Sequence, residues 1–285
     1  DRKTNSKDTK TSLDIEEICN CIKMKHIRKL VTRKNNKSIQ RVNSTPQANT
    51  NNKKIIKSKV VLVKKPIEKK KPLINIITRT SGRPNGFKRC HESIKNQSYA
   101  NIRHIVSIDR IEDAEYVKQY DVDYFFIDKQ KIAAQPDIPD PKTGKKFIYN
   151  LYFNELFAKV NGGWIMILDD DDYLVNKDAV LKMVNKIKNN TDMLIWQMKY
   201  PTGSMLPTIS EMGHKPRLAR IGSPCILVHS GIAKTIRWDG WKCGDFRFIS
   251  QVWNKTNEKR WIKEPLVLLG SGGGFGLRKD IKNSD

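Results

Sequence analysis

Four consecutive aspartates at positions 169–172 directly follow an apolar segment, Trp-Ile-Met-Ile-Leu, at 164–168. Adjacent carboxylates repel one another, so placing them beside a core costs stability unless a cation neutralises them. An acidic run of this kind is often a solvated turn before a helix. Here it follows a buried-type strand, and doubly wound sheets bind ligands at that end of their strands. The position favours Mg²⁺ or Mn²⁺, which bind carboxylates and substrate phosphates.

Short apolar runs alternate with helical patterns on both sides of this segment. Such alternation predicts an α/β fold with a mostly parallel, Rossmann-like sheet flanked by helices. The strands are expected at residues 73–77, 104–108, 124–127, 164–168 and 193–198, and the helices at 87–96, 112–120, 147–160 and 179–188.

The first 72 residues differ in composition from the rest of the chain. They carry 21 Lys/Arg against 6 Asp/Glu, a net charge of +15, whereas residues 73–285 carry 33 against 24, a net charge of +9. We therefore expect residues 1–71 to form a basic, flexible tail with a short helix at 13–31. Residues 72–285 are expected to form the folded domain. Nucleic acid is a candidate partner through the tail alone.

Compartment is indicated only by general features. The five cysteines are scattered without metal-type spacing, which favours a reducing, cytoplasmic environment. No apolar run approaches the roughly 20 residues that a membrane span needs. Abundant Lys, Asn and Ile are typical of an AT-rich genome, such as that of a large virus.

Several segments together resemble the family-2-type glycosyltransferases, which have the GT-A fold. The opening segment Asn-Ile-Ile-Thr-Arg-Thr-Ser-Gly-Arg-Pro (75–84) is similar to the first strand and nucleotide loop of that family. Residues 90–99, ending in Gln-Ser-Tyr, resemble its first helix, and residues 104–109 its second strand. The segment 165–174 resembles the family's signature, in which an apolar run is followed by Asp-x-Asp-Asp and then by an apolar residue. The likeness covers about residues 72–255.

The resemblance implies roles for individual residues. Asp109 would contact the base of a UDP-type donor, Asp169 would lie toward the ribose, and Asp171 with Asp172 would hold Mn²⁺ or Mg²⁺ on the diphosphate. The implied nucleotide-sugar pocket also includes Thr78, Thr80, Arg83 and Asp170.

The family also places an acidic pair at the start of a late helix, where one carboxylate deprotonates the acceptor. Asp245 occupies the second of these positions, and Gly244 replaces the first acid. Asp245 is therefore the expected general base, although an aspartate at a helix start is also a common N-cap. Trp241 is a candidate platform for an acceptor sugar, and core packing is its alternative role.

The sequence thus predicts a metal-dependent glycosyltransferase that moves a sugar from a nucleoside-diphosphate donor, such as a UDP-sugar, to a hydroxyl of a glycan or protein with inversion. Two alternatives stay open. One is a basic nucleic-acid-binding protein in which the acidic run holds a structural ion. The other is a GT-A-fold protein that binds without turnover, which the glycine at position 244 keeps open.

Overall fold

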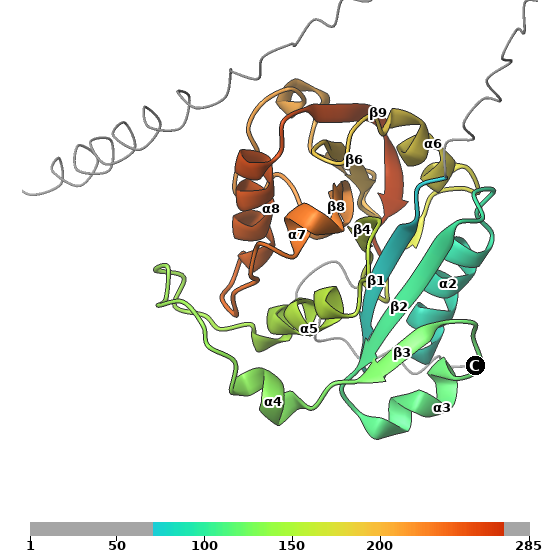
Figure 1. Ribbon diagram of the computed structural model, residues 1–285, viewed down its shortest axis with the longest axis vertical. Coiled ribbons are helices and arrows are strands. Elements are labelled where there is room, and N and C mark those ends of the chain that lie inside the picture. The colour runs from blue at the N-terminus through green and yellow to red at the C-terminus, as the bar shows by residue number, and fades with distance from the viewer. Residues whose placement is uncertain (1–70, 271–285) are drawn as a thin grey trace, which may run out of the picture. The chain divides into compact units, whose positions relative to one another are not determined.

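The computed structural model describes residues 71–270 (Figure 1). The expected tail, its helix at 13–31 and the glycine-rich segment after residue 270 lie outside the described residues. Within 71–270, a single sheet of nine strands has the order β3-β2-β1-β4-β8-β6-β9-β5, with β7 paired to β6. No described helix has the length and apolarity to cross a bilayer.

The first half of the sheet is parallel. β1 (Ile74–Thr80) pairs with β2 (Ile102–Ile108) on one side and with β4 (Trp164–Ile167) on the other, and β3 (Asp123–Phe126) forms the edge. β1 and β4 are buried along almost their whole length. Because β1 and β4 are parallel neighbours, their carboxyl ends lie at the same edge of the sheet. The four aspartates at 169–172, here called the acidic loop, begin at this edge.

The second half of the sheet is mixed. β8 (Ile226–His229) runs antiparallel to β4 and to β6 (Met193–Lys199). β6 therefore runs in the same direction as the strands of the first half. β9 (Lys259–Leu268) pairs parallel with β6, with register shifts. Two short strands complete the sheet. β5 (Tyr173–Leu174) pairs antiparallel with β9, and β7 (Met205–Leu206) pairs antiparallel with β6.

Helices cover both faces of the parallel strands (Figure 1). Successive strand residues face opposite sides, so Thr78 points toward α2 (Pro84–Lys95) while Arg79 points toward α5 (Tyr152–Ala158) and the turn η3 (Ile148–Leu151) before it. The other helical elements are η2 (Ile111–Asp113), α3 (Ala114–Val117), α4 (Lys129–Ala133), α6 (Ala179–Lys186), η4 (Ile209–Glu211), η5 (Ser223–Cys225), α7 (Ser230–Ala233) and α8 (Gly244–Lys255).

All five strands expected from the sequence are present, with each end within three residues of its expected position. β1 continues to Thr80 although its last residues are polar, because each pairs with a residue of β2. α2 starts earlier than expected, with Pro84 in its first turn, where proline is favoured. The helix expected at 112–120 is shorter, consisting of η2 and α3 alone.

Candidate active site

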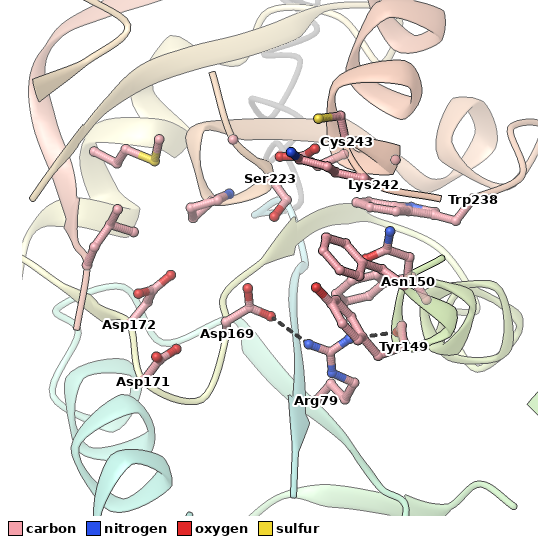
Figure 2. A pocket seen from close by; sticks show the side chains of 18 of the residues that line it. Arg79, Tyr149, Asn150, Asp169, Asp171, Asp172, Ser223, Trp238, Lys242 and Cys243 are labelled. Atoms are coloured by element: carbon pink, nitrogen blue, oxygen red, sulfur yellow. Dashed lines mark hydrogen bonds and ion pairs between the residues drawn. The ribbon is translucent and has the colours of Figure 1, made fainter. Parts of the chain in front are cut away.

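A cavity of about 360 Å³ opens where the acidic loop leaves β4 (Figure 2). Both halves of the sheet contribute to its walls. The parallel half supplies arginines and the acidic loop, and the mixed half supplies the start of α8. The lining residues used below are Arg79, Arg83, Phe147, Tyr149, Asn150, Phe153, Asp169, Asp171, Asp172, Tyr200, Gly222, Trp238 and Asp245.

Three of the four acidic-loop carboxylates line the cavity. Asp169 and Asp171 are about one-third exposed, at 36% and 30% of their side-chain areas. Asp172 is buried, and its Oδ1 accepts the Gly270 backbone N–H at 3.1 Å. Burial raises the pKa of Asp172 well above its usual range, and repulsion from Asp169 and Asp171 raises it further. The loop thus carries more negative charge than its own surroundings stabilise.

Asp170 points away from the cavity. Its side chain is 3% exposed, and its Oδ1 accepts a hydrogen bond from Arg83 Nη1 at 2.7 Å. Burial raises the pKa of this carboxyl to about 7, although Arg83 opposes the shift. Asp170 therefore positions Arg83, which lines the cavity, rather than facing a ligand itself.

Arg79 is a second arginine at the acidic loop, and the sequence analysis did not single it out. Its Nη1 donates to the Tyr149 carbonyl oxygen at 2.6 Å, and its Nη2 lies 3.9 Å from Asp169 Oδ1. The guanidinium also lies over the Tyr149 ring, 4.6 Å from its centroid. Its charge lowers the pKa of Asp169, while burial, the larger effect, raises it. The sequence signal that could have identified Arg79 is a charged residue inside an otherwise uncharged strand.

The acidic loop has the oxygen ligands that a hard divalent cation prefers. Asp169 Oδ1 is buried without a hydrogen-bond partner, and Asp171 and Asp172 line the same cavity. Within residues 71–270, no three His, Cys, Asp or Glu side chains form a metal site by themselves. A cation held by one or two carboxylates together with substrate phosphates does not need such a set, so the residues fit Mg²⁺ or Mn²⁺ bound jointly with a diphosphate.

Asp245 enters the cavity from the first turn of α8. Burial raises the pKa of its carboxyl, the Phe246 backbone N–H lowers it, and repulsion from Asp169 raises it again. The predicted base and the acidic loop are therefore close enough to affect one another, although 76 residues of sequence separate Asp169 from Asp245. A raised pKa suits a carboxylate that must accept a proton near neutral pH.

Close packing explains the glycine at position 244. A Cβ there would lie 2.8 Å from Asn150 Nδ2 and 2.9 Å from the Asp239 carbonyl oxygen. Asp239 is itself buried and receives two hydrogen bonds from Arg247, at 2.5 and 2.7 Å. The backbone at Gly244 thus occupies the space that the acid expected from the family pattern would need, and Asp245 is the acidic side chain that this turn presents.

An aromatic wall faces the acidic loop across the cavity. Figure 2 shows Tyr149 and Trp238 on this side, away from Asp171 and Asp172. Trp238 is buried and stacks on Phe248, with ring centroids 4.7 Å apart. Trp241, the expected acceptor platform, does not line the cavity. Its Nε1 donates to the Ile138 carbonyl oxygen at 2.9 Å, so it anchors the loop before η3.

Three more predicted nucleotide contacts also lie outside the cavity lining. Thr78 is fully buried, donates to the Leu168 carbonyl oxygen at 2.8 Å and is bonded to His104 Nε2 at 2.9 Å. Thr80 is buried and bonded to Tyr116 Oη at 2.8 Å. Asp109 lies at the end of β2, where its Oδ2 accepts from Tyr152 Oη at 3.5 Å. Thr78 thus holds Leu168, the residue before the acidic loop, and Thr80 lies beside Asp170, where its hydroxyl opposes the rise that burial causes in the pKa of that carboxyl.

No family model and no curated protein matches the sequence. Solved structures of Staphylococcus aureus TarS are similar in fold. A structure of its residues 1–349 has a TM-score of 0.54 at 16% identity, over 70% of this chain and 60% of that chain. The same fragment with UDP-GlcNAc has a TM-score of 0.54 at 15% identity, over 72% and 60%. With UDP the TM-score is 0.51 at 14% identity, over 69% and 60%.

These likenesses confirm the α/β fold of the GT-A type that the sequence predicts. The chain spans about 60% of the TarS fragment it matches. At this level of identity the shared property is the fold, and function depends on the residues of the site.

Proposed function

We propose that this protein is a glycosyltransferase that uses a nucleoside-diphosphate sugar, with UDP-sugars as the preferred donors. One observation carries the proposal: the acidic loop and Asp245 line one cavity of about 360 Å³ although they come from different halves of the sheet. That volume lies within the range of small-molecule sites. Two of the similar TarS structures are complexes, one with UDP-GlcNAc and one with UDP, which supports the choice of donor.

The donor diphosphate would lie against the acidic loop. Asp171 and Asp172 would hold Mg²⁺ or Mn²⁺ together with the phosphates, and Asp169 would lie toward the ribose. When bound, the cation supplies Lewis-acid stabilisation of the departing diphosphate. Arg79 and Arg83, fixed by Tyr149 and Asp170 respectively, add positive charge where the leaving group gains negative charge.

The acceptor hydroxyl would be activated from the opposite side by Asp245. A single carboxylate base suits direct displacement at the anomeric carbon, in which the acceptor oxygen attacks opposite the leaving diphosphate. The proton then moves to the Asp245 carboxylate, and configuration inverts. The aromatic wall, with Tyr149 and Trp238, offers an apolar face for a sugar ring.

The charge distribution along the chain bears on the first alternative function, and the site bears on the second. A nucleic-acid-binding protein would concentrate its basic residues on the folded part, whereas residues 73–285 carry a net charge of +9 against +15 for the first 72. A binding protein without turnover would not need a carboxylate of raised pKa beside the acidic loop, and Asp245 provides one.

The direct test is donor hydrolysis and sugar transfer measured over a panel of UDP-, GDP- and CDP-sugars with Mn²⁺. We expect hydrolysis of at least one UDP-sugar and loss of that activity with EDTA. Full activity in EDTA would contradict metal dependence. Calorimetric binding of UDP without hydrolysis of any donor would instead favour the binding protein.

A further inference from the structure

A second cavity of about 360 Å³ lies outside the candidate active site. It is formed by the segment that joins β7 to β8 and by one residue of β9. Its walls combine apolar side chains with charged ones. The lining residues used below are Glu211, Lys215, Arg217 and Arg220 on the charged side, and Pro216, Ile221 and Trp261 on the apolar side.

Glu211 holds the charged part of this cavity in place. Its side chain is 10% exposed and accepts from Arg217 Nη2 at 2.8 Å and from Arg220 Nε at 2.6 Å. The Thr208 backbone N–H and hydroxyl bind the other carboxylate oxygen at 2.8 and 2.9 Å. Arg220 is the main reason that the pKa of Glu211 is lowered to about 2. The carboxylate thus stays ionised and fixes two guanidinium groups.

The cavity carries an excess of positive charge. Lys215, Arg217 and Arg220 stand against the single carboxylate of Glu211. The Arg217 and Arg220 side chains are 71% and 43% exposed, so N–H groups not used by Glu211 are open to a ligand. Guanidinium groups held in fixed geometry bind carboxylate or phosphate through charge-assisted hydrogen bonds.

The apolar part of the cavity suits a ring. Trp261 is partly buried and contributes an indole, and Ile221 and Pro216 add aliphatic surface. Sugar rings present apolar faces that stack on indoles. Single-stranded nucleic acid, in contrast, is bound by several aromatic side chains in succession. Among the described residues that line this cavity, Trp261 is the one Trp, Tyr or Phe, and His214 adds a single imidazole.

The second cavity adjoins the candidate active site. Ile221 lines the second cavity and the next residue, Gly222, lines the first, so only this strip of backbone need separate them there. The two cavities are therefore lined by adjacent residues of one segment.

We propose that the second cavity binds an acidic sugar unit of an extended glycan acceptor, with the anion on Arg217, Arg220 and Lys215 and the ring against Trp261. This inference rests on the proposed glycosyltransferase function. It adds that the acceptor carries negative charge, as a carboxylate or a phosphate, a few sugar units from the reacting hydroxyl.

Hydrogen exchange measured by mass spectrometry on the full chain localises such binding. The probes are hyaluronan tetrasaccharide (carboxylate), mannose 6-phosphate (phosphate), neutral chitotetraose and a single-stranded RNA octamer. We expect at least one acidic sugar to protect residues 205–221 at concentrations where chitotetraose does not, with UDP saturating. The variant Lys215→Ala/Arg217→Ala should need about tenfold more ligand. The control Lys95→Ala/Lys118→Ala, which removes two exposed cations outside this cavity's lining, should behave as the wild type.

Equal protection by chitotetraose, equal weakening of both double variants, or strongest protection by RNA would each overturn the inference. The measurement needs no turnover, so it can fail separately from the proposed function. Intact donor hydrolysis without protection by either acidic sugar would reject the second cavity alone. Protection without hydrolysis of any donor would reject the glycosyltransferase and, with it, the acceptor role of the bound sugar.

Discussion

The two halves of the sheet differ in how their residues reach the candidate active site. In the parallel half, β1 and β4 lie side by side, and the acidic loop follows β4 directly. In the mixed half, β8 reverses direction between β4 and β6, and Asp245 reaches the cavity from the start of α8. In the parallel half, the order of the strands places the acidic loop at the cavity. The mixed half depends on long-range packing.

Removing a carboxylate of the parallel half should have the largest effect. Asp171→Ala should lower donor turnover by about 10³-fold or more and weaken UDP binding with Mn²⁺, because a cation on the diphosphate contributes several kcal/mol. Steady-state kinetics and calorimetry measure both. Asp178→Ala is the matched control, since its carboxylate binds Ser98 outside the cavity. Equal turnover in the two variants would mean that the acidic loop is only a turn.

Packing in the mixed half can be tested at Gly244. Gly244→Ala should destabilise the fold by about 1–3 kcal/mol, because the new Cβ would press on the Asp239 backbone and the Asn150 amide. Urea unfolding gives the free energy. Gly231→Ala is the control: its new Cβ would meet the side chain of His229 at 3.3 Å, an easier contact to relieve. Similar stabilities would show that the missing acid at 244 is not explained by space.

The charge of the acidic loop predicts a dependence of stability on pH. Burial raises the pKa of Asp170 to about 7 and also raises those of Asp169 and Asp172. Between about pH 4 and pH 7 the folded state therefore binds more protons than the unfolded state, and stability falls as pH rises.

Mn²⁺ should offset this loss at pH 7.5, raising the thermal midpoint by about 2–4 °C for each kcal/mol gained. At pH 5 the effect should be smaller because the loop carries less charge. Thermal scans with and without Mn²⁺ at both pH values test this, with Asp171→Ala as the variant that should not respond. A wild-type midpoint unaffected by Mn²⁺ at pH 7.5 would contradict the fit of the loop to a cation.

The smallest expected effect is that of the basic segment. Deleting residues 1–71 should leave donor hydrolysis unchanged and remove salt-sensitive adhesion to heparin, since this segment contains most of the excess charge and little apolar sequence. Both properties can be measured on the purified truncation. Loss of folding would move the domain boundary toward the N-terminus.

The sequence predicts the parallel half well because its signals are local. The apolar run before the acidic loop identifies β4, and similar runs identify β1 and β2 within a few residues. Thr78 and Arg79 show the limit of this reasoning. The strand alternation that buries Thr78 also directs Arg79 to the cavity, but which face holds the ligand depends on the placement of α5.

The mixed half is less evident from the sequence. β9 begins Lys-Arg-Trp-Ile-Lys-Glu-Pro, with charges and a proline that obscure strand periodicity, and it is held by pairing with β6 and β5. Trp238 lines the cavity while Trp241, three residues later, anchors a loop. Residue type alone did not distinguish the two tryptophans, because their surroundings come from distant segments.

The central claim is that Asp245 and the acidic loop act on one reaction in one cavity. The direct measurement compares sugar transfer and UDP affinity in Asp245→Asn and in the wild type, with the anomeric configuration of the product determined by NMR. We predict a loss of transfer of about 10²–10⁴-fold with UDP affinity nearly unchanged, and an inverted product from the wild type. Since asparagine caps a helix about as well as aspartate, near-normal transfer by Asp245→Asn would contradict the assignment of the base. A retained product would contradict the displacement itself.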